Sequence, residues 1–158
     1  IAKGYIVDAG TQILREAKVQ RSIINAGGDI SVIGRRPDNL PWRVGVQNPE
    51  KPSEIRWILP LDDESVVTSG DYQRFFTHEG VRYHHIIDPR TGYPARELTS
   101  VTIVGNGAAA CDALSTAVFV LGLEEGRALV ESLPDVEAII VSSSETWISP
   151  GLAKVVTE

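Results

Sequence analysis

Turn signals recur at short intervals through the middle of this chain, and they leave room only for short strands between them. Gly27-Gly28, Gln47-Asn48-Pro49 and His78-Glu79-Gly80 each separate two segments rich in β-branched, aliphatic or aromatic residues. Glycine, proline and asparagine supply the backbone angles of tight turns, so segments flanking them in this way are typical of hairpins. Hairpin connections favour antiparallel pairing.

The segments predicted as strands share alternating or consecutive apolar residues. They are residues 21–25, 29–33, 42–46, 56–61, 65–69, 72–77, 81–87, 98–104, 137–142 and 146–149. Three other segments repeat apolar residues at helical spacing, namely residues 5–17, 110–121 and 124–133. We therefore predict an α+β fold, with a largely antiparallel sheet and flanking helices.

The segment from residue 110 to residue 121 is the clearest helix, and Gly122 ends it. Its apolar stripe consists of Ala110, Ala113, Leu114, Ala117, Val118 and Leu121. In the first helix, the residues at helical spacing are Tyr5, Ile6, Ala9, Ile13, Leu14 and Ala17. A stripe of this kind predicts the helix face that packs against the core.

Composition narrows the functional classes. The chain has 158 residues and a formal net charge of −6, which argues against a general nucleic-acid binder because such proteins usually carry a basic patch. The charge does not exclude anion binding, since local dipoles or a metal ion hold phosphates in acidic proteins. Cys111 is the single cysteine, so no disulfide forms within the chain. We expect Cys111 to be a small buried residue rather than a nucleophile, because no cationic neighbour in sequence lowers its pKa.

The sequence contains no methionine and begins at Ile1. We interpret it as part of a longer or processed chain, so missing targeting signals say little about location. No apolar run reaches the length of a membrane span.

Asn25-Ala26-Gly27-Gly28-Asp29 follows a predicted strand and is the first candidate binding segment. Two adjacent glycines let the backbone approach a ligand closely, and free N–H groups there suit a phosphate. No third glycine opens a helix, so the segment is not a dinucleotide-binding fingerprint. The other interpretation is a tight turn between two strands, with Asp29 as a turn residue.

The second candidate segment runs from His84 to Gly92 and places two histidines, an aspartate and an arginine at a strand end and turn. His84 and His85 are adjacent on a strand and point to opposite faces, so they do not readily bind one metal ion. One histidine near Asp88 better suits proton transfer or contact with a phosphate. A surface hairpin with incidental histidines is the alternative interpretation.

The third candidate is a pair of oxygen-bearing side chains on the 110–121 helix. Asp112 and Thr116 are four residues apart and share one face, opposite the predicted apolar stripe. A carboxylate and a hydroxyl so placed suit Mg²⁺, a hard cation that takes oxygen ligands and usually keeps substrate phosphates as partners. The alternatives are a solvated polar face, or a Thr116 hydroxyl that hydrogen-bonds to the helix backbone.

Taken together and in this order, five segments resemble the ApbE family of FAD:protein FMN transferases. They are Lys3-Gly4-Tyr5-Ile6-Val7-Asp8, Asn25-Ala26-Gly27-Gly28-Asp29-Ile30, Thr68-Ser69-Gly70-Asp71-Tyr72, His85-Ile86-Ile87-Asp88-Pro89-Arg90-Thr91-Gly92 and Asp112-Ala113-Leu114-Ser115-Thr116. The resemblance runs from Lys3 to about Gly122. Full family members are longer, so we expect residues 1–158 to be the C-terminal part of a single flavin transferase domain.

The resemblance implies an enzyme that binds FAD with Mg²⁺, cleaves the pyrophosphate and passes FMN to a threonine or serine hydroxyl of an acceptor protein, releasing AMP. FAD hydrolysis to FMN and AMP, or a non-catalytic FAD-binding module, are the alternatives. It further implies an acceptor that is a subunit of an electron-transfer complex, and no nucleic-acid partner. The implied location is the periplasmic side of the bacterial inner membrane, with any lipid anchor outside this chain.

The same resemblance assigns expected roles to residues. Asp112 and Thr116 match the magnesium-binding pair, and His85 matches a functionally important histidine, with Asp88 as a second candidate for accepting the hydroxyl proton. The residues expected to contact FAD are Asn25, Gly27, Gly28, Asp29, Ser69, Gly70, Asp71, Arg90 and Thr91. In the family, the N-terminal half supplies further FAD contacts and a metal ligand, so we expect the 158 residues alone to be inactive.

Overall fold

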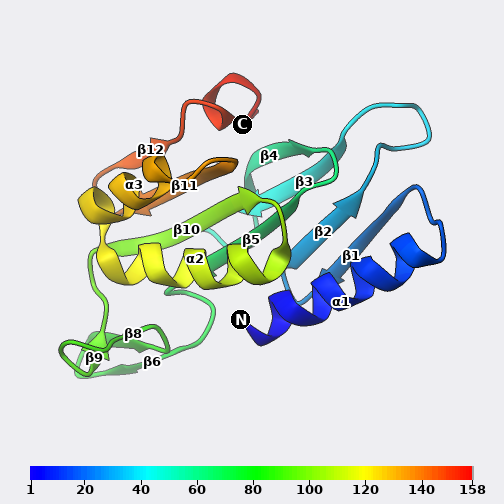
Figure 1. Cartoon of the computed structure of the whole chain (residues 1–158). Helices are drawn as coiled ribbons and strands as arrows, with labels where there is room; N and C mark the ends of the chain where they lie inside the picture. The colour runs from blue at the N-terminus through cyan, green and yellow to red at the C-terminus, as the bar shows by residue number, and fades with distance from the viewer. Residues whose placement is uncertain (158) are drawn as a thin grey trace.

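Six strands form one antiparallel sheet, in the spatial order β1-β2-β5-β10-β11-β12 (Figure 1). Their bounds are β1 Ser22–Ala26, β2 Asp29–Ile33, β5 Ser65–Gly70, β10 Leu98–Gly105, β11 Val136–Ser142 and β12 Thr146–Ile148. The computed structural model describes residues 1–157. The predicted α+β class and the largely antiparallel sheet are confirmed.

The helices and outer strands cover the two faces of this sheet. They are α1 Ala2–Glu16, α2 Ala108–Leu121, α3 Leu123–Ser132, β3 Trp42–Gln47, β4 Ile55–Leu61 and the 3₁₀ helix η1 Leu152–Lys154. Helices α2 and α3 pack on one face, and the β3–β4 hairpin packs on the other. None of the helices in the described chain is long and apolar enough to cross a bilayer.

The central strands are buried on both faces. Val66 and Val67 are neighbours on β5 and enter opposite cores, and Ile139 and Ile140 do the same on β11. Successive side chains of a strand point to opposite faces, so each strand fills both cores at once. This arrangement explains why the strands contain consecutive β-branched residues rather than a strict alternation of apolar and polar ones.

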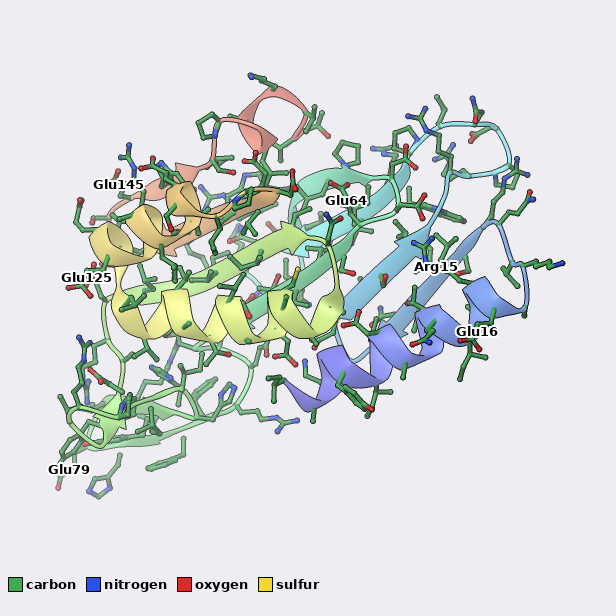
Figure 2. All side chains as sticks on the ribbon, viewed as in Figure 1. Arg15, Glu16, Glu64, Glu79, Glu125 and Glu145 are labelled. Atoms are coloured by element: carbon green, nitrogen blue, oxygen red, sulfur yellow. The ribbon has the colours of Figure 1, made fainter. Side chains whose placement is uncertain are left out.

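Four short strands form two small hairpins outside the main sheet, beside the C-terminal end of α2 (Figure 1). They are β6 Phe75–His78, β7 Val81–His84, β8 Ile87–Asp88 and β9 Tyr93–Pro94. Figure 2 shows the side chain of Glu79 at the far tip of this region. The prediction of one strand over residues 81–87 is wrong, because β7 ends at His84 and a second pairing begins at Ile87. The His84 ring supports the bend, since its Nδ1 accepts the N–H of Ile86 at 3.3 Å.

Helix α1 packs on β1, β2 and α2, but it does not use the predicted apolar face. Its buried residues are Gly4 and Val7, whereas Tyr5, Ile6 and Ile13 are 69%, 62% and 65% exposed. A Cβ built on Gly4 would lie 2.4 Å from the carbonyl oxygen of Ala108 in α2. The two helices therefore approach too closely for large side chains, and the smallest residue stands at their contact.

Helix α2 also turns a different face inward from the predicted stripe. Its buried residues are Ala108, Cys111, Asp112, Ser115, Val118 and Phe119. Ala110, Ala113 and Ala117 are exposed instead. Alanine satisfies helical periodicity on any face, whereas Asp112 and Ser115 are buried because hydrogen bonds across to Gly4 and Ser69 satisfy them.

The start of α2 is held by a side chain from α1. The Asp8 carboxylate accepts the N–H groups of Ala108 and Ala109, at 2.7 and 2.9 Å. The first N–H groups of a helix have no partner within the helix, and a negative charge there is favourable. Asp8 therefore fixes the N-terminal end of α2, and with it Asp112, against α1.

We expect Gly4→Ala to destabilise the full-length protein by about 1–3 kcal/mol, the usual cost of overpacking. The new methyl group would meet the backbone of Ala108 and Ala109, which cannot move aside as a flexible side chain can. Gly10→Ala in the same helix is the matched control, because its Cβ would meet only the Ile24 side chain, at 3.2 Å. Urea denaturation measures both variants, and equal free energies of unfolding would contradict the close helix contact.

Candidate functional site

Two carboxylates meet at the junction of α1, α2 and β2. Asp29 is the first residue of β2 and is fully buried, and Asp112 lies near the start of α2 and is nearly buried. Their carboxyl groups are close enough to hydrogen-bond to each other when one of them carries a proton. The predicted α2 residue and the predicted β2 residue therefore belong to one cluster.

Lys3 and Gly4 join this cluster from the first turn of α1. The ammonium group of Lys3 donates to Oδ1 of Asp29. The backbone N–H of Gly4 donates to Oδ2 of Asp112 at 3.1 Å, and the Ile1 nitrogen is 2.7 Å from the same oxygen. Neither Lys3 nor Gly4 was predicted to be a site residue, although both belong to the first of the five segments that resemble the family.

Burial acts on the pKa of both carboxyl groups. It raises the pKa of Asp29 above its usual value, and the hydrogen bond from Lys3 only partly offsets that effect. Burial also raises the pKa of Asp112, and the hydrogen bond from the Gly4 N–H acts against that effect. Asp112 is the carboxyl group at the edge of the cluster, since it keeps some exposed surface and Asp29 keeps none.

Hydroxyl groups extend the cluster along α2. The Oγ of Ser69, near the end of β5, is 2.8 Å from Ser115 Oγ and 3.3 Å from Thr116 Oγ1. Thr116 also donates to the backbone carbonyl of Asp112 at 3.3 Å. The hydrogen bond from the Thr116 hydroxyl to the helix backbone, one of the alternatives for this residue, is thus present. The alternative of a solvated polar face does not hold for Asp112, which packs against α1, whereas Thr116 is exposed.

The Gly27-Gly28 turn joins β1 to β2 directly before Asp29. Its φ angles are +61° and +99°, and Asn25 Oδ1 accepts the N–H of Gly28 at 2.9 Å. Such positive φ angles favour glycine. A Cβ on Gly28 would have no neighbour within 4 Å, so open space lies beside the turn. The predicted turn between two strands is confirmed, and a ligand contact by these residues stays a prediction.

Asp71 lies next to the cluster in sequence but has a different partner. Its carboxylate accepts from Arg82 of β7 at 2.9 Å, and this ion pair connects the small hairpins to the end of β5. The neighbouring Gly70 packs against the Tyr72 ring, which a Cβ would meet at 2.5 Å. Of the predicted Ser69-Gly70-Asp71 segment, Ser69 alone hydrogen-bonds to α2.

The two adjacent histidines occupy different environments, as the sequence predicted. His84 is buried, its Nε2 lies 2.7 Å from the Ala95 carbonyl, and its ring packs edge-on against Phe119. His85 is exposed, and its Nδ1 lies 3.3 Å from the carbonyl of Arg74. A carbonyl only accepts hydrogen bonds, so this contact favours the His85 tautomer with the hydrogen on Nδ1, in which Nε2 is the acceptor.

Asp88 and Arg90 form a local pair that holds the β8–β9 turn. Arg90 donates to both oxygens of Asp88, at 3.0 Å and 3.2 Å from its Nε, and its Nη2 reaches the Val120 carbonyl at 3.2 Å. Hydrogen bonds from Arg90 hold the pKa of Asp88 below its usual value. Thr91 Oγ1 accepts the N–H of Tyr93 at 3.2 Å, so it too serves the turn.

The predicted residues thus divide between the two ends of α2. Asp112 lies near the start of the helix, whereas Asp88 and Arg90 are attached at Val120, about 12 Å further along an axis that rises about 1.5 Å per residue. Among residues 1–157, no hydrogen bond joins His85 or Asp88 to Asp112 or Thr116. A ligand that contacts both groups must therefore be extended.

The donor set at Asp112 and Thr116 fits a hard cation. Across residues 1–157, no three His, Cys, Asp or Glu side chains are arranged to hold a metal ion. Asp112 and Thr116 nevertheless offer a carboxylate and a hydroxyl, the oxygen donors that Mg²⁺ prefers. Oδ2 of the neighbouring Asp29 is buried without a hydrogen-bond partner, so the cluster has more acceptors than donors. These residues fit Mg²⁺ in a site completed by water or phosphate oxygens.

Cys111 has no part in this chemistry, as the sequence predicted. It is buried between α2 and β5, and burial raises its pKa to about 12. We expect its thiol to resist a disulfide reagent such as Ellman's reagent at pH 8 and to react once the protein is unfolded, because the thiolate is the reactive form. Rapid labelling of the folded protein would contradict this burial.

The fold and the cluster define an α+β protein with an oxygen-rich cluster beside a glycine turn. Comparisons with known proteins agree on one family: residues 1–140 match the ApbE family. The chain therefore belongs to the ApbE family.

Characterised relatives and solved structures extend this match. The chain is 38% identical over 150 residues to an FAD:protein FMN transferase of Klebsiella pneumoniae, covering 94% of this chain and 46% of the relative. It is 40% identical over 154 residues to one of Treponema pallidum, covering 89% of this chain and 42% of the relative.

Among solved structures, the ApbE protein from Thermotoga maritima has a TM-score of 0.90 and 39% identity, covering all of this chain and 52% of that one. The flavin transferase ApbE from Vibrio cholerae has a TM-score of 0.85 and 30% identity, covering 98% of this chain and 50% of that one. The chain thus spans about half the length of the relatives it matches.

Proposed function

We propose that the protein containing this chain transfers FMN from FAD to a threonine or serine hydroxyl of an acceptor protein, with Mg²⁺, and releases AMP. The observation that supports this most is the cluster of Asp112, Asp29 and Thr116 beside the Gly27-Gly28 turn, in a chain whose relatives are named FAD:protein FMN transferases. The reaction needs a site for a pyrophosphate and its cation, and this cluster supplies the oxygen donors.

Asp112 and Thr116 would hold the Mg²⁺. The cation offsets negative charge on the pyrophosphate and holds it in position. The backbone N–H of Gly4 orients the Asp112 carboxylate, since it donates to one of the carboxylate oxygens. Ser69 orients the Thr116 hydroxyl from the end of β5.

The transfer exchanges one phosphorus–oxygen bond for another. The acceptor hydroxyl oxygen forms a bond to the FMN phosphorus, and the bond from that phosphorus to the AMP phosphate breaks, with its electron pair leaving on AMP. The hydroxyl proton passes to a base of the protein. Of the two candidates, His85 suits this step better because its Nε2 is free, whereas Arg90 engages both oxygens of Asp88 and lowers its pKa.

The separation of the two groups along α2 suits a dinucleotide. A base must lie within hydrogen-bond reach of the hydroxyl that attacks the FMN phosphorus, so we place the pyrophosphate between Asp112 and His85, with Mg²⁺ at the Asp112 end. The open space beside Gly28 would admit part of the nucleotide, because no side chain fills it. Arg90 and Thr91 hold the β8–β9 turn through their hydrogen bonds, and we propose that this turn contacts FAD.

For the acceptor we propose a subunit of an electron-transfer complex, met on the periplasmic side of the bacterial inner membrane. This assignment follows from the family, and a lipid anchor outside this chain would keep the enzyme at that surface. Fractionation of cells that express the full-length protein tests the location.

The direct test of the reaction is intact-mass analysis of a candidate acceptor after incubation with the full-length protein, FAD and Mg²⁺. We expect the acceptor to gain the mass of one FMN less one water, and AMP to appear in equal amount. Release of FMN and AMP without any gain of mass on the acceptor would show an FAD diphosphatase instead.

A further inference from the structure

Asp29 is a buried carboxylate with an incomplete set of partners. Its side chain is fully buried, its Oδ1 accepts from Lys3, and its Oδ2 has neither solvent nor a hydrogen-bond donor. An unsatisfied buried acceptor is costly, so native proteins rarely keep one without an ion, a water or a functional reason. The Asp112 carboxylate lies close by, because Lys3 contacts Asp29 and the N–H of the adjacent Gly4 contacts Asp112.

Lys3 is the cationic side chain that contacts the two carboxylates among the described residues. It neutralises Asp29 only in part, since nearly half of the Lys3 side chain is exposed and solvent screens the pair. Asp112 accepts the backbone N–H of Gly4, which is a neutral donor. Two carboxylates held side by side repel each other, and a cation bound between or beside them relieves that repulsion.

We propose that Asp29 is a positioning residue for the cation site, which holds the Asp112 carboxylate toward its open side and raises the affinity of that side for Mg²⁺. Asp29 does not contact FAD, because it has no exposed surface. Lys3 anchors Asp29 from behind, and the adjacent Gly4 N–H fixes one oxygen of Asp112. The inference rests on the proposed function, since it takes Asp112 as the cation-binding residue.

Two substitutions in the full-length protein have opposite expected effects. Asp29→Asn removes the charge at constant volume and supplies an amide N–H that satisfies Asp112, so Mn²⁺ binding should weaken about 10–100-fold, as is usual for residues that support a metal ligand. In EDTA the melting temperature of this variant should not fall. Lys3→Gln leaves both carboxylates without a cation, so Mn²⁺ should bind more tightly and the melting temperature in EDTA should fall.

The probe is Mn²⁺ alone, with binding followed by electron paramagnetic resonance and melting temperatures measured in parallel. Glu137→Gln is the matched control. Glu137 is a half-buried carboxylate on β11, which is separated from β2 by β5 and β10, and its partners are Ser149, Gly151 and Leu152. Its substitution should leave Mn²⁺ affinity within twofold of wild type.

The outcomes separate this inference from the proposed function. If wild type binds Mn²⁺, Asp112→Asn does not, and Asp29→Asn binds as wild type does, then Asp29 is merely structural and the inference is overturned while the cation site stands. If Asp29→Asn loses both stability in EDTA and affinity for Mn²⁺, the Lys3→Gln variant distinguishes the two roles of Asp29. A merely structural role predicts that Lys3→Gln binds Mn²⁺ more weakly than wild type, whereas the positioning role predicts that it binds Mn²⁺ more tightly. If wild type binds no Mn²⁺, both the site and the inference fail.

Discussion

Replacing Asp112 with asparagine or alanine in the full-length protein is expected to abolish Mg²⁺-dependent cleavage of FAD. Asp112 is the carboxylate of the cluster that keeps some exposed surface, and the Gly4 N–H holds one of its oxygens in place. Loss of one preorganised electrostatic contact commonly lowers turnover about 10²–10³-fold. Loss of the metal ion together with that contact lowers turnover further. The measurement is AMP release with and without Mg²⁺.

The asparagine variant is the more informative one. Asp112 is nearly buried and accepts the Gly4 N–H, so alanine would also leave that donor without its partner at the α1–α2 contact. Asparagine keeps an oxygen for Gly4 and removes only the charge. Asp62→Asn, at an exposed ion pair with Arg35, serves as the control and should retain activity. Unchanged AMP release by a folded Asp112→Asn protein would contradict the assignment of the cation site to α2.

Replacing His85 with alanine is expected to lower FMN transfer by roughly 10²–10⁴-fold, the usual cost of losing an acid–base group. The contact of Nδ1 with the Arg74 carbonyl favours the tautomer in which Nε2 is the acceptor, and a proton acceptor needs this arrangement. His78→Ala is the matched control, because His78 is an exposed histidine on the neighbouring strand β6 and should change transfer little.

The neighbouring His84 is expected to behave differently. Its ring bonds to Ala95 and Ile86 and packs on Phe119, so His84→Ala should lower the melting temperature rather than the rate per folded molecule. Transfer assays normalised to folded protein distinguish the two histidines. A larger loss of turnover for His84→Ala than for His85→Ala would reverse their assigned roles.

The sequence predicted the strands well because each lies between recognisable turn residues. The Gly27-Gly28 turn and the two β-hairpins at His78-Glu79-Gly80 and Ser144-Glu145 are where glycine and polar residues placed them. The break after His84 was not predictable, because it depends on a buried ring contacting backbone groups further along the chain.

Helix orientation was predicted poorly for a physical reason. The alanines of α2 and the large apolar residues of α1 repeat at helical spacing, so they were predicted to face the core. The residues that lie in the contact between the two helices are Gly4 and the hydrogen-bonded Asp112 instead. The assignment of Asp112 and Thr116 as cation ligands stays a prediction. Their connection to Lys3 and Asp29 arises from tertiary packing of three elements, which spacing within one helix does not reveal.

The most direct test of the central claim is an anomalous-diffraction map of the full-length protein crystallised with FAD and Mn²⁺. The account predicts a manganese peak at coordination distance from the Asp112 carboxylate and the Thr116 hydroxyl, with the FAD pyrophosphate on its open side and Asp29 behind Asp112. A peak elsewhere, for example beside the acidic residues Asp62, Asp63 and Glu64, with none at Asp112, would contradict it.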